Sequence, residues 1–151
     1  MRVAAVAIHA FSCCTDTATL CVFDPAGLRH KLADDCDWWS IPAAELAAVN
    51  AGQAAFFNLN GDGAYALEVQ AELAEPQACV HIAVVSGRVF IGAGEDVTGG
   101  GLEPDAACGG LFVDLPVGSY RIQARRDGAR IGLAFLPDAR GSNAFGDLVR
   151  I

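Results

Sequence analysis

Residues 119–136 read SYRIQARRDGARIGLAFL, two strands of alternating polarity joined by the pair Asp127-Gly128. Asp-Gly suits a two-residue type I′ turn, in which both central residues take a positive φ. With this pair as the loop, residues 119–126 pair with residues 129–136, and the apolar side chains of both strands face the core. The predicted core pairs are Tyr120 with Phe135, Ile122 with Leu133, and Ala124 with Ile131.

Two further hairpins are predicted upstream of this one, because turn-forming residues separate pairs of apolar strands. The strands are residues 53–59 and 64–71 around the turn 60–63, and residues 78–85 and 88–92 around the turn 86–87. In the second hairpin Ile82 faces Ile91 and Val84 faces Val89. Since its other face is apolar too, this hairpin is predicted to lie at the centre of a sheet.

The rest of the chain adds a strand and short helices. Residues 17–23 are β-branched and apolar, which predicts a strand. Residues 25–32 fit one helical turn, and a longer helix is expected from Ser40, as its cap, to a stop at residues 50–52. Hairpins with one or two short helices indicate a mainly-β fold, an antiparallel β-sandwich or barrel, in a single domain over residues 1–151.

Composition and charge narrow the classes of function. The 151 residues are 53% apolar, and ten Lys and Arg stand against eighteen Asp and Glu, a net charge of −8. This charge disfavours a nucleic-acid backbone and favours a protein partner with a basic surface. No apolar run approaches the ~18 residues needed to span a membrane. We therefore expect neither nucleic acid nor membrane as a partner.

Six cysteines, at positions 13, 14, 21, 36, 79 and 108, form no C-x-x-C pair and no zinc or iron–sulfur spacing. Cys21 and Cys79 lie in apolar strands, where a thiol acts as a small hydrophobe. Buried reduced thiols are the favoured interpretation, and disulfides or a metal site are the alternatives. Residues 1–13 imitate a secretion signal without a cleavage site, so we expect a first β-strand and a cytoplasmic protein, with a periplasmic one as the alternative.

Two carboxylate-rich stretches, residues 34–37 and 95–105, form the candidate binding surface and are named the acidic loops. Their acids are Asp34, Asp35 and Asp37, followed by Trp38-Trp39, and then Glu95, Asp96, Glu103 and Asp105. Acids suit a basic partner, and tryptophan is frequent at binding hot spots. In the alternative interpretation the acids are merely solvated and at least one tryptophan belongs to the core.

No recognisable catalytic constellation stands in the sequence, and the G-x-S-x-G elbow of serine hydrolases is absent. Cys13 or Cys14 with His9 or His81 would make a Cys–His pair. A lone histidine on an apolar strand is more often a core residue. We therefore expect no enzymatic activity, no cofactor and no metal ion.

Four of the ten basic residues gather in the last hairpin, at Arg121, Arg125, Arg126 and Arg130. In the predicted register Arg125 meets Arg130, a contact that is unfavourable unless anions lie nearby. Nearby carboxylates neutralise these arginines in one interpretation. In the other, the arginines form a site for an anion or an acidic peptide.

Four strings carry a resemblance to known sequences. They are TDTATLCVFDP at residues 15–25, DWW at 37–39, GGGLEP at 99–104 and LPVGSYRI at 115–122. Across residues 15–136 the chain resembles an uncharacterised family of small bacterial β-rich proteins. Because these motifs are structural, the resemblance implies no site residue. In size, charge and architecture the chain is also loosely similar to immunity and inhibitor proteins of bacterial toxin or nuclease systems.

These observations favour a non-enzymatic binding protein, an immunity-type inhibitor that covers a basic site of a cognate toxin or nuclease. The alternative is a β-sandwich that binds a small ligand or carbohydrate, with Trp38 or Trp39 as the platform. A hydrolase with a cryptic site is the third hypothesis.

Overall fold

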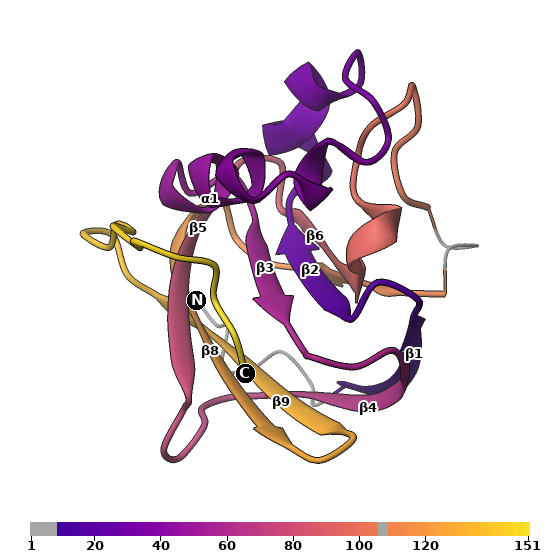
Figure 1. The fold of residues 1–151 in the computed structure, drawn as a ribbon. Coiled ribbons are helices and arrows are strands. Elements are labelled where there is room, and N and C mark those ends of the chain that lie inside the picture. The colour runs from indigo at the N-terminus through magenta and orange to yellow at the C-terminus, as the bar shows by residue number, and fades with distance from the viewer. Residues whose placement is uncertain (1–8, 106–108) are drawn as a thin grey trace.

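The computed structural model describes residues 9–105 and 109–151, in which two sheets enclose one apolar core (Figure 1). The larger sheet has the order β1-β4-β9-β8-β5 and the smaller has the order β3-β2-β6-β7. The strands are β1 His9–Thr15, β2 Thr19–Phe23, β3 Ala55–Asn58, β4 Gly63–Gln70, β5 Ala78–Val84, β6 Arg88–Ala93, β7 Leu111–Asp114, β8 Gly118–Asp127 and β9 Arg130–Pro137. The fold is mainly β, and its two sheets do not close into a barrel, as in a β-sandwich. The expected first strand is described only from His9 onward.

The two sheets differ in how they are covered. In β4 and β5 of the larger sheet, buried and more exposed side chains alternate, as in a strand with one solvated face. In contrast, every residue of β2 is buried. The smaller sheet is covered on its outer side by the α-helix α1, Pro42–Asn50, and by the 3₁₀ helices η2 Pro25–Lys31, η3 Trp38–Ser40 and η4 Gly94–Asp96.

Helix α1 forms where it was expected, but its cap differs. Pro42 occupies the first turn, where its missing N–H costs nothing, and the alanine-rich sequence continues the helix to Asn50. The N-cap is Ile41 and makes no side-chain hydrogen bond, so the predicted capping by Ser40 is wrong. The Ser40 hydroxyl instead donates to the carbonyl of Asp37, at 2.7 Å, and closes η3.

The hairpin of β8 and β9 is confirmed, but its register differs by two residues from the prediction. Asp127 pairs with Arg130 and Ile122 with Phe135, so the loop is Gly128-Ala129. Gly128 has φ +61° and Ala129 has no positive φ, which matches a type II′ turn with glycine first, not a type I′ turn. A shift of two residues in the pairing keeps each side chain on its face of the sheet, so the same side chains face the core as predicted. Its members Tyr120, Ile122, Ala124, Ile131, Leu133 and Phe135 are all buried.

The same register corrects the predicted contact between arginines. Arg125 lies opposite Gly132, while Arg130 lies opposite Asp127. The two guanidinium groups therefore need no anion between them.

The predicted hairpin over residues 78–92 is wrong. β5 pairs with β8 in the larger sheet, whereas β6 pairs with β2 and β7 in the smaller. The chain changes sheets at residues 85–87, and the buried carboxylate of Asp24 holds this crossing. It accepts hydrogen bonds from the backbone N–H groups of Val85, Ser86 and Gly87 at 2.7–3.2 Å, and from the Ser86 hydroxyl.

The predicted hairpin over residues 53–71 is wrong for the same reason. β3 pairs with β2 in the smaller sheet, and β4 lies between β1 and β9 in the larger. The pairing of β4 with β9 is parallel, in contrast to the other strand pairs of the described residues. The turn residues between the strands direct the chain from one sheet to the other. Turn chemistry predicts a change of direction, but it does not predict which strand the chain then joins.

Residues 138–151, named the C-terminal segment, cover one edge of each sheet. In Figure 1 this segment, in yellow, leaves β9, passes beside α1 and ends near β3. The Asn143 side chain bonds the backbone of His81 in β5, and Asn58 of β3 bonds the backbone of Val149 and Ile151. The edge strands β3 and β5 therefore have partners, which removes a template for aggregation.

The five cysteines of the described residues are free, and Cys108 lies outside those residues. Cys13 and Cys21 are buried as expected, but Cys14, Cys36 and Cys79 are exposed. Cys79 is exposed because it lies on the outer face of β5, where side chains alternate between the core and the solvent. Among the described helices none is long and apolar enough to cross a bilayer.

Candidate functional site

The two acidic loops lie against each other, although about 60 residues separate them in the chain. The N–H of Gly100 donates to the carbonyl of Asp34, and that of Gly101 donates to the carbonyl of Leu32, both at 2.7 Å. The indole N–H of Trp38 donates to the carbonyl of Thr98, also at 2.7 Å. These bonds combine the predicted acids into one surface.

The glycines of the second loop permit this close contact. Gly100 has φ +59°, and a Cβ built on it would lie 2.9 Å from the Cβ of Cys36. A Cβ on Gly99 would lie 3.1 Å from the carbonyl oxygen of Asp35. Any side chain at Gly100 would be strained and crowded, so the Gly-Gly-Gly run is needed for the loops to meet.

Most of the predicted acids point to solvent. The exposed ones are Asp34, Asp35, Asp37, Glu103 and Asp105, whereas Glu95 and Asp96 are half-buried. Two ion pairs accompany them: Lys31 with Asp34 at 3.2 Å, and Arg29 with Glu103 at 3.6 Å. Exposed pairs of this kind contribute about 0–1 kcal/mol, so the loops keep an acidic surface.

Both tryptophans belong to the core, with Trp38 5% and Trp39 7% exposed. Trp39 stacks on Phe56 of β3, with ring centroids 5.9 Å apart and planes inclined by 9°. Trp38 meets the same ring edge-on, and Lys31 lies 4.4 Å from the Trp38 ring. The tryptophans therefore anchor the first acidic loop to β3, and little of either side chain reaches the surface.

A pocket of about 450 Å³ opens beside the first acidic loop. Its lining comes from β2, β3, η3, η4, α1 and the C-terminal segment, and it is named the Glu45 pocket. The lining residues are Thr17, Thr19, Cys36, Asp37, Trp39, Ser40, Glu45, Asn58, Glu95 and Leu148. The structure thus brings Asp37, Trp39 and Glu95 of the predicted site together in one concave feature.

Glu95 is held in the pocket wall by three donors. Its Oε1 accepts the hydroxyls of Thr15 at 2.9 Å and Thr17 at 2.6 Å, and its Oε2 accepts the N–H of Asp16 at 2.7 Å. Partial burial opposes ionisation, but these hydrogen bonds prevail and lower the pKa of Glu95 below its ordinary value. Glu95 is therefore a fixed negative charge at neutral pH.

Glu45 is a second carboxylate of the pocket, beside Glu95 and the exposed Asp37, and is only 3% exposed. Burial raises its pKa, although a hydrogen bond from Asn58 to Oε2, at 2.9 Å, and the charge of Arg150 act in the opposite direction. No other donor of the described chain contacts this carboxylate. Sequence reasoning missed Glu45, because a glutamate in an alanine-rich helix looks like any solvated helical glutamate.

A second cavity, of about 330 Å³, adjoins the first acidic loop and shares Asp37 with the Glu45 pocket. Its lining residues are Ala33, Asp34, Asp35, Asp37, Trp38 and Ile41. Ile41 is 59% exposed and gives this acidic cavity an apolar rim.

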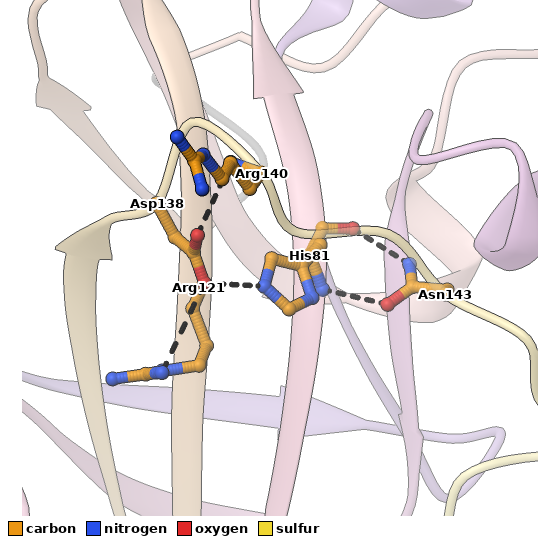
Figure 2. A network of polar contacts seen from close by, with 5 residues as sticks. All are labelled: His81, Arg121, Asp138, Arg140 and Asn143. Carbon is orange, nitrogen blue, oxygen red and sulfur yellow. Dashed lines mark hydrogen bonds and ion pairs between the residues drawn. The ribbon is translucent and has the colours of Figure 1, made fainter.

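His81 lies elsewhere, in a network that fastens the C-terminal segment to the larger sheet (Figure 2). Its Nε2 lies 2.9 Å from Oδ2 of Asp138, and the Arg121 guanidinium approaches the same oxygen at 3.9 Å. The hydrogen bond with His81 is the main cause of the lowered pKa of Asp138. A Cβ on Gly141 would collide with the His81 ring, so this glycine lets the segment lie directly on the imidazole.

The possible Cys–His pair with His81 is separated by the fold. β1, which carries Cys13 and Cys14, and β5, which carries His81, are the two outer strands of the larger sheet. The pKa of Cys13 is raised to about 11, mainly by burial, so its thiol is protonated at neutral pH.

The arginines of the last hairpin are mostly engaged in structural contacts. Arg126 donates to the carbonyls of Leu59, Gly128 and Ile151, while Arg125 donates to the carbonyl of Glu75. Arg125 and Arg130 line a cavity of about 380 Å³ together with two acids, Glu68 and Asp127. The charges around this cavity are therefore balanced.

The fold and the pocket define a β-sandwich with an acidic surface and an acid-lined pocket at one side of its smaller sheet. The chain belongs to a family of unknown function (DUF6386), whose model matches residues 7–151.

Among solved structures, the chain is similar to one titled "Crocagin biosynthetic gene J", with a TM-score of 0.55 and 12% identity. The likeness covers 88% of this chain and 97% of the other, and at this identity it shows the fold alone. The search of curated proteins finds no match. Residues of the described ranges form no group of three or more His, Cys, Asp or Glu side chains suited to a metal ion.

Proposed function

We propose that this chain is a non-enzymatic binding protein that docks a basic protein surface on its acidic loops, as an immunity-type inhibitor docks a cognate toxin or nuclease. The observation that carries the proposal is the hydrogen bonding of the two loops to each other through Gly100 and Gly101. Backbone groups make these bonds, so the exposed side chains of Asp34, Asp35 and Asp37 are not used to join the loops and can meet a partner.

Exposed apolar side chains near the acids support a protein partner. Ile41 is 59% exposed and Leu102, in the second loop, is 75% exposed. Charged groups mainly accelerate association, while apolar contacts at the centre of an interface supply much of the affinity. A surface with both kinds of group suits a partner that is basic and partly apolar.

The placement of the reactive side chains also favours binding over catalysis. Cys13 has a raised pKa and faces the core. The His81 ring bonds Asp138 and lies under Gly141, in a network whose other bonds hold the C-terminal segment. Cys13 is thus a core side chain, and His81 has a structural partner in Asp138.

The test uses a partner captured from extract of the native host and then purified. Its association with the wild type is measured by stopped flow at two salt concentrations. We expect the variant Asp34→Asn/Asp35→Asn/Asp37→Asn to associate more slowly and with a weaker salt dependence, because exposed charges act over about 8–10 Å at ordinary salt. A second variant removes Glu95, Asp96, Glu103 and Asp105.

The matched control is Asp62→Asn/Glu72→Gln/Asp114→Asn, which changes three exposed acids outside the loops. Both triple variants raise the net charge from −8 to −5, so a difference between them reports position and not total charge. Equal association rates for the wild type and both acidic-loop variants would refute the proposed acidic surface.

A small-ligand-binding protein is the second candidate, and the Glu45 pocket is the observation that favours it. The pocket, at about 450 Å³, falls in the range of about 300–1,000 Å³ that is usual for such sites. A carbohydrate has less support, because the Trp39 ring stacks on Phe56 and is only 7% exposed. Little of its face is available as a sugar platform.

A further inference from the structure

We infer that the Glu45 pocket binds one organic cation, an ammonium or guanidinium group at the end of an alkyl chain. The inference rests on the proposed function, since a lysine or arginine side chain of a basic partner is one source of this group. A free alkylamine is the other source, and it presents the same chemistry.

The first argument is the state of the Glu45 carboxylate. Glu45 as a residue is 3% exposed and lines the pocket, and its carboxylate accepts a single hydrogen bond, from Asn58 to Oε2. The second oxygen, Oε1, has no donor within the described chain and is not fully buried, so it is open to the pocket. A buried carboxylate is usually paired or fully hydrogen-bonded, because desolvation of the charge is costly. An ammonium or guanidinium group in the pocket would supply the missing donor.

The second argument is the charge of the pocket. Glu95 adds a fixed negative charge, and Asp37 contributes a third, exposed carboxylate. The described lining contains no Lys, Arg or His side chain. The Arg150 charge that acts on Glu45 belongs to a side chain that is 60% exposed and paired with Asp147 at 3.1 Å. The pocket therefore attracts cations and repels anions.

The third argument concerns the kind of cation. Trp39 and Leu148 form an apolar wall beside the acids, which suits an alkyl chain with a charged end. A metal ion instead needs several ligands at close range, and the described residues form no group of three or more candidate ligands. An organic cation fits these features better than a divalent metal.

The probe is n-butylammonium, followed by nitrogen–proton NMR of the whole chain. The protein has two tryptophans, so its spectrum contains two indole N–H signals. We expect the Trp39 signal to shift saturably, with a dissociation constant of about 1–10 mM for such a small ligand. The Trp38 signal should move less, because its N–H is bonded to Thr98 and its residue does not line the pocket. The uncharged analogue 1-butanol should leave Trp39 nearly unchanged.

The variant Glu45→Gln keeps the size of the side chain and should weaken binding of n-butylammonium at least tenfold. Its matched control is Glu72→Gln, an exposed glutamate outside the pocket, which should bind as the wild type does. Equal shifts with 1-butanol and n-butylammonium in the wild type would overturn the inference even if Glu45→Gln failed to fold. Unchanged affinity of a folded Glu45→Gln variant would overturn it as well, and so would displacement of the amine by calcium at low millimolar concentration.

Further measurements separate the two sources and the two proposals. A Gly-Lys-Gly peptide that binds more tightly than n-butylammonium identifies a partner's side chain as the ligand, and the reverse order identifies a free amine. If the amine does not bind but the Asp34/Asp35/Asp37 variant slows partner association, the pocket inference fails and the proposed function stands. If the amine binds and no acidic-loop variant changes association with the protein partner, the proposed docking surface is refuted and the pocket inference stands.

Discussion

The C-terminal segment and the acidic loops both join distant parts of the chain, but they use their polar groups differently. In the C-terminal segment, side chains such as that of Asn143 bond backbone groups of β5 and α1. In the acidic loops, bonds between backbone groups join the two loops, and the side chains of Asp34, Asp35 and Asp37 are exposed. The polar side chains of the C-terminal segment therefore stabilise the fold, whereas the exposed acids of the first loop are available for contact with a partner. The Glu45 pocket lies between the two, with Leu148 from one and Asp37 and Glu95 from the other.

The largest loss in the free energy of unfolding is expected for a change in the C-terminal segment. Asn143→Ala removes three hydrogen bonds, to the N–H and carbonyl of His81 and to the carbonyl of Val49. Each buried group left unsatisfied costs about 1–3 kcal/mol, and partial exposure lets water replace some bonds, so we expect a loss of about 2–4 kcal/mol. Urea unfolding measures it. The neighbouring exposed Ser142→Ala should change stability by less than about 0.5 kcal/mol, and an equal loss in both variants would contradict the assigned role of Asn143.

A change at Glu95 tests whether one acid of the acidic loops stabilises the fold. Glu95→Gln places an amide donor against the hydroxyl or N–H donors of Thr15, Thr17 and Asp16, which should cost about 1–2 kcal/mol at pH 7. Because the pKa of Glu95 is lowered in the fold, its stabilisation is present above the ordinary value of about 4.3 and is lost as the pH falls through the folded value. Urea unfolding from pH 7 to pH 3 should show the two proteins converging. A constant difference in unfolding free energy across this pH range would contradict a stabilisation that depends on the charge of Glu95.

Glu45 should behave in the opposite way. Its pKa is raised in the fold, so its favourable contribution is present below about pH 4.3 and is lost as the pH rises through the folded value. Glu45→Gln should therefore be more stable than the wild type at pH 7, by up to about 1 kcal/mol, and no more stable at pH 4. Unfolding at both pH values, with Glu72→Gln as the control, checks the sign. A variant that is less stable at pH 7 would show that Glu45 supports the fold as an ion.

The smallest change in stability is expected when the exposed acids of the first loop are replaced. Asp34→Asn/Asp35→Asn/Asp37→Asn breaks only the exposed pair of Lys31 with Asp34, so stability should change by less than about 1 kcal/mol. Thermal unfolding provides the measurement. A large loss of stability would remove the contrast with the C-terminal segment, because the acids would then have a structural role.

The sequence predicted the local features of the fold well. The alternating apolar residues placed six core side chains of the last hairpin on the correct face, and Pro42 with its alanines placed α1. These features depend on neighbours along the chain, which the sequence displays directly. The predicted turn was wrong, because Asp-Gly and Gly-Ala are adjacent and both satisfy a two-residue loop.

The candidate site was predicted in part. Charge and aromatic content pointed to Asp37, Trp39 and Glu95, which line one pocket. Glu45 and Asn58 were missed, because their types and spacing are ordinary and only packing makes them neighbours. The burial of both tryptophans also followed from packing, through the stack on Phe56.

By itself, the sequence determined the β content, the inward faces of the strands, the short helix and the negative charge, since these follow from side-chain chemistry and its period along the chain. Only the tertiary structure decided which strands pair, because the turns at residues 60–63 and 85–87 suit a hairpin and a crossing between sheets equally well. Asp24 settled the second of these by bonding three successive backbone N–H groups from more than 60 residues away. The meeting of the acidic loops at Gly100 and the burial of Glu45 are long-range contacts of the same kind, and no local pattern encodes them.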